Sequence, residues 1–451
     1  MSIPARGEHH ISTGNIFILA MGAKRYTARG AADRLRTLHK LIATMSASLR
    51  PALPILIGAS IMLSLAMGLR QSLGIFLPPL TQDLGISVSD FTIAISVQNL
   101  VWGVLQPFAG AMVVRWGFRP LMVAGALLYI LGMVLLTTAH GMLGVLLGAG
   151  FAVGAALAAT GSAVAMAASV RPVPPAMRSL VLGIVSAAGS LGALVAAPLG
   201  QSVAQTWDWR MGGVSFVVLA VFMLPAAWYA GKVDSLPRLP APVDGEQNAR
   251  QALSMAMKNL PFVVMATAYF VCGMQLVFLT THLPAYLALC GLDPMLSAKA
   301  LATIGGFNAM GSLFFGWAGG RWNKQILLGL IYILRSLSFI WYFHTLPTPE
   351  STLVFAAVIG FLWLGVVPLV SGWIAQTFGL RWQAMLAGVA FCGHQLGSFT
   401  GAIGGGLAYD LLHSYTLAWQ VGAGMGIAAG IVQVMVAYLA RPRPPWAPVA
   451  T

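Results

Sequence analysis

Charged residues are scarce in this sequence. Only 8% of its 451 residues are Asp, Glu, Lys or Arg, and acids are the rarer kind, with 11 Asp and Glu against 25 Lys and Arg. Soluble globular domains carry about 25% charged residues. Because so few charges cannot cover the surface of a soluble chain of this length, the composition excludes an ordinary soluble enzyme.

Cysteine is also rare, with three residues in the chain, which bears on disulfides and metals. Cys272, Cys290 and Cys392 lie in or beside apolar stretches, without CxxC or Cys/His spacing. We therefore expect neither a disulfide framework nor a metal site. No apolar stretch carries paired carboxylates, a metal-ligand set or a nucleophile beside a base, so we expect no enzymatic activity and no cofactor.

Apolar stretches of about 20 residues, long enough to cross the ~30 Å bilayer core as helices, recur along the chain. We predict helices at 53–79, 90–113, 120–139, 142–169, 179–205, 211–231, 260–289, 298–320, 325–345, 351–376, 384–409 and 415–440. The predicted domains are a basic N-terminal tail (1–50), a six-helix bundle (51–231), a linker (232–258), a second six-helix bundle (259–440) and a short tail (441–451). The predicted fold class is an all-α polytopic membrane protein of twelve spans.

The first 50 residues are basic and differ in composition from the rest. Residues 33–45 place Leu35, Leu38, Leu41 and Ile42 at helical spacing, so one interpretation is a tail that lies on anionic lipid. Because this amphipathic pattern is weak, we favour an unstructured tail, or a chain whose true start is Met45.

Basic residues mark one side of the membrane. Of the 25 Lys and Arg, 21 fall in the tails and in the loops of one side, whereas Arg210 and Lys299 lie on the other. Cytoplasmic loops are enriched in Lys and Arg. We therefore predict a multi-pass protein of the cell inner membrane with both termini in the cytoplasm. Since topology and lipid attraction account for the positive charge, we expect no nucleic-acid partner.

The sequence repeats at an offset of 206 residues. Leu77, Pro78, Gly85, Gly110, Arg115 and Trp116 recur as Leu283, Pro284, Gly291, Gly316, Arg321 and Trp322. At an offset of 205, Gly183 and Gly192 recur as Gly388 and Gly397. Six spans in each half give both halves the same orientation, so the repeat predicts two parallel six-helix halves related by an axis along the membrane normal.

Two loops carry a family resemblance. GAMVVRWGFRP (110–120) and GWAGGRWNK (316–324) resemble the paired loop signature of the major facilitator superfamily. The resemblance implies that these loops help to gate the two halves through Gly110, Arg115, Gly117, Arg119, Gly316, Gly320, Arg321 and Lys324. Val114 stands where the family usually has an acid that latches the halves. Within the superfamily, MRSLVLGIVSAAGSLG (177–192) is similar to the fifth-helix motif of the monocarboxylate porter and oxalate/formate antiporter branch.

Two arginines lie inside predicted spans, where a charge costs roughly 2.5–3.5 kcal/mol on insertion scales. Arg70 is in the first span, one of those that line the central cavity in this superfamily. A guanidinium there can bind a carboxylate through two parallel hydrogen bonds, which we favour over an arginine that reaches to the membrane surface. Arg335 is in the ninth span, which is usually peripheral, so we favour a packing role over substrate contact.

Neutral polar groups complete the candidate site. The predicted substrate-binding residues are Arg70, Gln98, Asn99, Gln275, Asn308, His394, Gln395 and Ser398. Each neutral residue alone is more often a hydrogen bond between helices than a substrate ligand. His282 and His394 are the histidines that lie away from the ends of spans, which makes them the candidates for proton coupling, with His394 the better one. For both, a neutral packing histidine is the commoner explanation.

All eleven acids fall outside or at the borders of the predicted spans. A cavity for cations or proton-driven sugars generally needs a buried carboxylate, so this pattern favours an anion. The sequence therefore predicts a secondary transporter of a small organic anion, a mono- or dicarboxylate, that acts by alternating access as a proton symporter or an anion exchanger. We expect it to be a functional monomer. The alternative is an exporter of amphipathic or drug-like compounds, and a membrane sensor is disfavoured because the linker is too short for an output domain.

Overall fold

The computed structural model describes residues 50–237, 248–345 and 347–439. The first six spans comprise α2 (Leu53–Ser72) and α3 (Leu77–Leu84), α4 (Val88–Trp116), α5 (Phe118–Thr137), α6 (Met142–Val145), α7 (Val153–Thr160) and α8 (Ser162–Val170), α9 (Arg178–Thr206), and α10 (Trp209–Val221) with α11 (Met223–Ala230). After α12 (Ala249–Lys258) come α13 (Leu260–Leu289), α14 (Pro294–Ala318), α15 (Lys324–His344), α16 (Pro349–Trp363) with α17 (Val366–Phe378), α18 (Gln383–Leu412) and α19 (Thr416–Leu439).

Ten spans among the described residues are long and apolar enough to cross a membrane. The 25-residue α14 and the 30-residue α18 complete twelve. The predicted all-α fold of two six-helix repeats is thus confirmed, with helix ends within a few residues of the predictions. The main addition is α12, a short helix in the linker that begins with a capping box between Asn248 and Gln251.

The acids of the spans lie nearer to helix ends than to the bilayer centre, although several helices run further than predicted. Asp83 is the residue before the end of α3, Asp90 is the third residue of α4 and Glu350 is the second of α16. Asp90 and Ser87 form the reciprocal capping box of α4. No acid therefore occupies the middle of a described span.

The two repeats match in backbone conformation as well as in sequence. Gly85 follows α3 with a φ of 63°, and its counterpart Gly291 follows α13 with a φ of 72°. This left-handed conformation is open to glycine at little cost. The first span of each half therefore ends in the same way.

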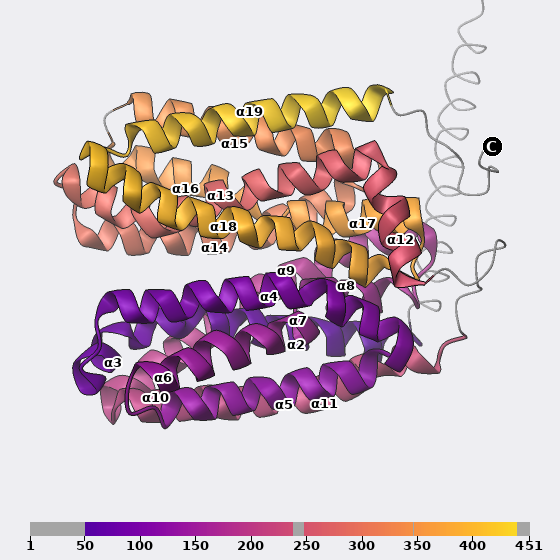
Figure 1. The fold of residues 1–451 in the computed structure, drawn as a ribbon, viewed down its shortest axis with the longest axis horizontal. Helices are drawn as coiled ribbons and strands as arrows, with labels where there is room; N and C mark the ends of the chain where they lie inside the picture. Colours follow the sequence, from indigo (N-terminus) through magenta and orange to yellow (C-terminus); the bar gives the residue numbers. More distant parts are fainter. Residues whose placement is uncertain (1–49, 238–247, 346, 440–451) are drawn as a thin grey trace, which may run out of the picture. The chain divides into compact units, whose positions relative to one another are not determined.

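The halves meet along two seams. One joins α4 to α18, which lie side by side in Figure 1, and the other joins α9 to α14. The helix ends that carry Arg115, Arg171, Arg321 and Arg381 all lie on one side of the bundle, which we call the basic end.

Close backbone approach holds the seams together toward the basic end. A Cβ atom on Gly316 would lie 2.4 Å from the Cα of Gly183, and one on Gly110 would lie 2.4 Å from the backbone nitrogen of Met385. A hydrogen bond of 3.2 Å joins Ser186 to Ser312 across the second seam. Because the repeat relates Gly110 to Gly316, both seams close at equivalent positions.

Candidate functional site

A polar cluster lies where the first seam passes the middle of the spans. It consists of Arg70 on α2, Asn99 on α4, and His394, Gln395 and Ser398 on α18, and we call it the central polar cluster. Arg70 Nη2 donates to Asn99 Oδ1 at 2.5 Å, and Gln395 Nε2 donates to the same oxygen at 3.2 Å. One amide oxygen thus joins side chains from both halves.

His394 extends the cluster along α18. Its Nδ1 lies 3.2 Å from Gln395 Oε1 and 3.4 Å from Ser398 Oγ. Arg70, Asn99 and His394 are partly exposed, whereas Gln395 and Ser398 are buried. Three of the five cluster residues thus retain some accessible surface.

Arg70 has hydrogen-bonding capacity to spare. Asn99 is its one hydrogen-bond acceptor among the described residues, and its Nε has none. Its guanidinium carbon lies 5.2 Å from the ring centre of Trp102, a cation–π contact. The charge is thus held in place from one side, and no carboxylate among the described residues pairs with it.

Aromatic rings close the cluster toward the basic end. The ring centres of Trp102 and Phe391 lie 4.5 Å apart. Phe391 stacks on His394 with 5.4 Å between ring centres and 8° between ring planes. The ring centre of Tyr269 on α13 lies 4.7 Å from that of His394. We call Trp102, Tyr269 and Phe391 the aromatic layer. All three are at most 9% exposed, and the cavity beyond Tyr269 and Phe391 has only about 20 Å³. A ligand at the cluster therefore meets a barrier on this side.

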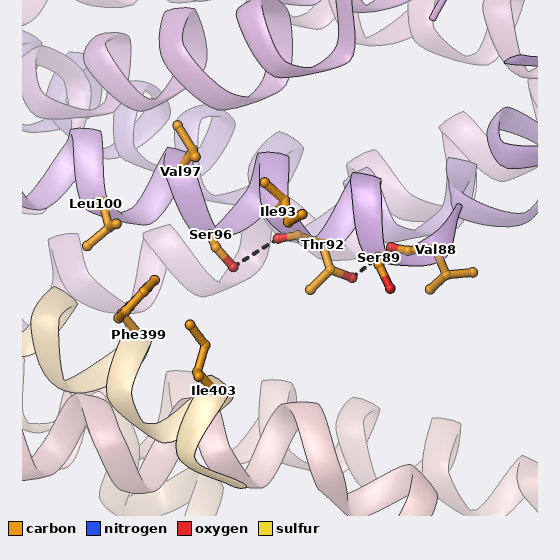
Figure 2. A pocket seen from close by; sticks show the side chains of 9 residues that line it. All are labelled: Val88, Ser89, Thr92, Ile93, Ser96, Val97, Leu100, Phe399 and Ile403. Carbon is orange, nitrogen blue, oxygen red and sulfur yellow. Dashed lines mark hydrogen bonds between the residues drawn. The ribbon is translucent and has the colours of Figure 1, made fainter. Parts of the chain in front are cut away.

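The outer part of the first seam holds a pocket, and none of the five cluster residues is among those that line it. A pocket of about 350 Å³ lies between the outer parts of α4 and α18, with Val88, Ser89, Thr92, Ile93, Ser96, Val97, Leu100, Phe399 and Ile403 as its lining (Figure 2). Thr92 and Ser96 turn their hydroxyls back to carbonyls of their own helix, at 3.0 and 2.9 Å. The pocket wall is therefore mostly apolar, and the seam that is tight at Gly110 is parted here.

Three of the predicted substrate-binding residues lie outside the cluster. Gln98 donates to the carbonyl of Ala149 at 2.6 Å, in a π-helical turn (Leu146–Ala152). A π-helical turn interrupts the regular backbone hydrogen bonds of an α-helix, and the buried Gln98 side chain supplies a hydrogen-bond donor to this turn. Gln275 donates to Ser336 and to the carbonyl of Gly422, and so ties α13 to α15 and α19.

Asn308 has a different structural task. Its Oδ1 accepts from the backbone nitrogen of Leu364 at 2.8 Å, where the tenth span breaks between α16 and α17. A helix break leaves backbone donors without partners inside the membrane, and neighbouring side chains must satisfy them. Asn308 thus stabilises this break.

His282 and His394 differ in their surroundings. His282 Nε2 lies 2.9 Å from the carbonyl of Ala402, and its ring packs against Phe278 and Tyr415 at 5.1 and 5.2 Å. It is 8% exposed. His282 is therefore positioned as a packing residue, whereas His394 belongs to the central polar cluster.

The signature loop of the first half is fixed by an acid from elsewhere in the chain. Asp234, at the end of the sixth span, accepts from the backbone nitrogens of Phe118 and Arg119 at 2.9 and 2.8 Å. Gly117 has a φ of 92°, and a Cβ there would lie 2.8 Å from the Asp234 carboxylate. A carboxylate at a helix N-terminus is stabilising, so Asp234 caps α5 although Val114 replaces the usual acid.

Basic residues near the signature loops are held within their own half. Burial lowers the pKa of Arg171, which the carboxylate of Asp234 partly offsets. Arg119 lies over Trp228 at 4.6 Å and Arg321 over Trp317 at 4.2 Å. Buried Lys324 donates to the carbonyl of Gly319 at 2.7 Å, whereas Arg115 and Gly320 are exposed.

The sequence did not single out the aromatic layer. A signal was present, because Trp102 follows Asn99 by three residues and Phe391 precedes His394 by three, so each shares a helix face with a cluster residue. Tyr269 has no such neighbour on α13, and only the tertiary packing brings it to His394.

Twelve spans in two parallel repeats, with a polar cluster between halves that are closed at one end and parted at the other, define a polytopic membrane transporter. The Major Facilitator Superfamily model matches residues 59–402. The chain belongs to this superfamily, whose members are transporters rather than enzymes.

The relatives that this chain resembles are transporters, and those named for a substrate differ in the substrate. It is 22% identical over 371 residues to the uncharacterized MFS-type transporter YcxA of Bacillus subtilis, with 77% of this chain and 86% of that protein covered. It is 26% identical to human monocarboxylate transporter 11, with 68% and 60% covered. It is 28% identical to the purine ribonucleoside efflux pump NepI of Salmonella paratyphi B, with 74% and 81% covered. The resemblance to monocarboxylate transporters thus recurs, beside one to an efflux pump.

Solved structures share the fold. The transporter FucP in the outward conformation superposes with a TM-score of 0.68 at 15% identity, over 86% of this chain and 99% of that one. The proton:xylose symporter XylE, bound to 6-bromo-6-deoxy-D-glucose, gives 0.67 at 13% identity, over 86% and 96%.

Proposed function

We propose that this secondary transporter moves a small organic anion, a mono- or dicarboxylate, by alternating access. The observation that carries the proposal is Arg70, which is partly exposed in the middle of the bundle and lacks a carboxylate partner among the described residues. Asn99, His394 and Gln395 would orient the ligand, and the aromatic layer would block its exit until the halves rock.

The proposed topology follows from the loop charges. The basic end would face the cytoplasm of a cell whose inner membrane holds the protein, with both termini on that side. The open pocket would then face outward. The proposal treats each chain as a functional monomer, since the cluster is assembled from the two halves of one chain.

Anion uptake needs a compensating charge. An inside-negative potential of 100 mV opposes the entry of one negative charge by ~2.3 kcal/mol. Proton symport, with His394 as the carrier, or exchange against another anion would each remove this cost. His394→Gln should abolish uptake driven by a pH gradient if symport operates, whereas the matched variant His282→Gln should retain it because His282 packs outside the cluster.

The test is uptake of labelled mono- and dicarboxylates into proteoliposomes, with and without a pH gradient and with unlabelled anion inside. Arg70→Ala should abolish uptake. Arg210→Ala is the matched control, because Arg210 pairs with Asp83 at 3.0 Å outside the cluster. If no carboxylate moves under any of these conditions, the proposal is wrong.

The second candidate is export of amphipathic or drug-like compounds. The mostly apolar wall of the outer pocket favours it, and so does the similarity to a purine ribonucleoside efflux pump. Export of such compounds would not depend on a guanidinium, so activity that survives Arg70→Ala would favour this candidate over the anion carrier.

A further inference from the structure

Arg335 is a buried charge that the described site does not use. It lies on α15 with 0% of its surface exposed, and its Nη1 donates to the Cys272 sulfur at 3.3 Å. Its guanidinium lies 5.3 Å from the ring centre of Tyr332. Its Nε and Nη2, and the Tyr332 hydroxyl, have no hydrogen-bond partner among the described residues. A thiol is a weak acceptor, so the positive charge is poorly compensated where it lies.

A short chain of contacts leads from Arg335 to the central polar cluster. Cys272 and Tyr269 are three residues apart on α13 and therefore share a face. The Tyr269 ring contacts His394, with 4.7 Å between ring centres. Arg335 thus lies one layer of side chains behind the cluster.

We infer that Arg335 is a positioning residue whose charge attracts the transported anion through the α13 layer without touching it. This inference rests on the proposed function. The interior offers no acid in the middle of a described span to cancel the charge, and low-dielectric surroundings let its field reach the cluster. Arg70 would bind the anion directly, while Arg335 would raise the positive potential at the same place.

An electrostatic role has a quantitative signature, because Coulomb energy is proportional to the charge of the ligand. At a separation of roughly 10 Å and an effective dielectric constant of about 20, removal of one positive charge weakens binding of a monoanion roughly 15-fold and of a dianion roughly 250-fold. A neutral ligand should be unaffected. A residue that serves only packing would instead weaken all three by the same factor.

The test is equilibrium binding of succinate, succinamate and succinamide to the full-length protein in nanodiscs at pH 7. These ligands have nearly the same shape but carry two, one and no negative charges. Arg335→Gln should produce the charge-graded loss, and Arg335→Lys should restore most of the affinity because it keeps the charge. An equal loss for all three ligands would overturn the inference.

Cys272→Asp tests the same idea with Arg335 in place. The new carboxylate would lie within reach of Arg335 Nη1 and cancel its field, and the protein should fold at least as well as before because a buried charge gains a partner. Anion binding should fall with the same grading, while the matched variant Cys272→Asn should bind as the wild type does. If Cys272→Asp and Cys272→Asn bind alike, the inference is wrong. Failure of both anions to bind the wild type would overturn the proposed function itself.

Discussion

Because Arg70 contacts Asn99, a substitution at Asn99 can place a negative charge beside Arg70 and so occupy the proposed anion site. In Asn99→Asp the amide oxygen that accepts from Arg70 at 2.5 Å becomes part of a carboxylate. The shape of the side chain is nearly unchanged, but a permanent negative charge now occupies the place next to the guanidinium. A transported anion would have to displace this tethered competitor.

The magnitude follows from the geometry. Two unit charges about 4 Å apart attract by about 4 kcal/mol at an effective dielectric constant of 20. The wild type already has part of this attraction, because the hydrogen bond from charged Arg70 to the Asn99 amide is worth about 1.5 kcal/mol at the low end of such bonds. The difference of about 2.5 kcal/mol corresponds to a roughly 70-fold loss of anion affinity.

The assay is equilibrium binding of a labelled carboxylate to purified protein, together with thermal unfolding of the same samples. Asn99→Leu is the control, because it removes the acceptor and adds no charge. We expect Asn99→Asp to bind the anion at least tenfold more weakly than Asn99→Leu and to unfold at a higher temperature. If the two variants bind equally well, Arg70 is not the anion site and the reasoning fails.

Further predictions concern residues around the site. Gln98→Leu should reduce stability by roughly 0.6–1.7 kcal/mol and leave anion affinity unchanged, as chemical unfolding and binding would show, because Gln98 serves the carbonyl of Ala149. Gly316→Leu should force the second seam apart at the basic end, so that the thiol added by Ser312→Cys becomes reactive to a water-soluble maleimide; unchanged labelling would contradict this. Asp234→Ala should cost about 1–2 kcal/mol of stability in thermal unfolding through loss of the α5 cap, while Asp234→Asn, which keeps an oxygen acceptor at the cap, should cost less.

The spans could be predicted from the sequence because the bilayer imposes a length and a composition on every one of them. The irregular segments could not. The π-helical turn at Leu146–Ala152 and the break that follows Trp363 in the tenth span both lie within continuous apolar runs. They depend on side chains distant in sequence, since Gln98 is 51 residues from Ala149 and Asn308 is 56 from Leu364.

The site could be predicted only in part for the same reason. Arg70 and His394 stand out because ionisable groups are rare in membrane spans. Residue type alone cannot distinguish Asn99, which meets Arg70, from Asn308, which holds a helix break. The face that a glycine-rich helix presents to its neighbours is poorly marked in its sequence, so partners become known only when the helices are packed.

The contacts at the basic end bear on how the halves can separate. Arg119, Arg321 and Lys324 bind a ring or a carbonyl of their own half, while the seams rest on backbone approach at Gly110 and Gly183 and on the bond between Ser186 and Ser312. Dispersion at such close contacts falls off within about an ångström of separation. The seams should therefore open in a switch-like manner and with little dependence on ionic strength. A binding anion would then change the balance of states chiefly at the central polar cluster, where Asn99 and Gln395 already bridge the halves.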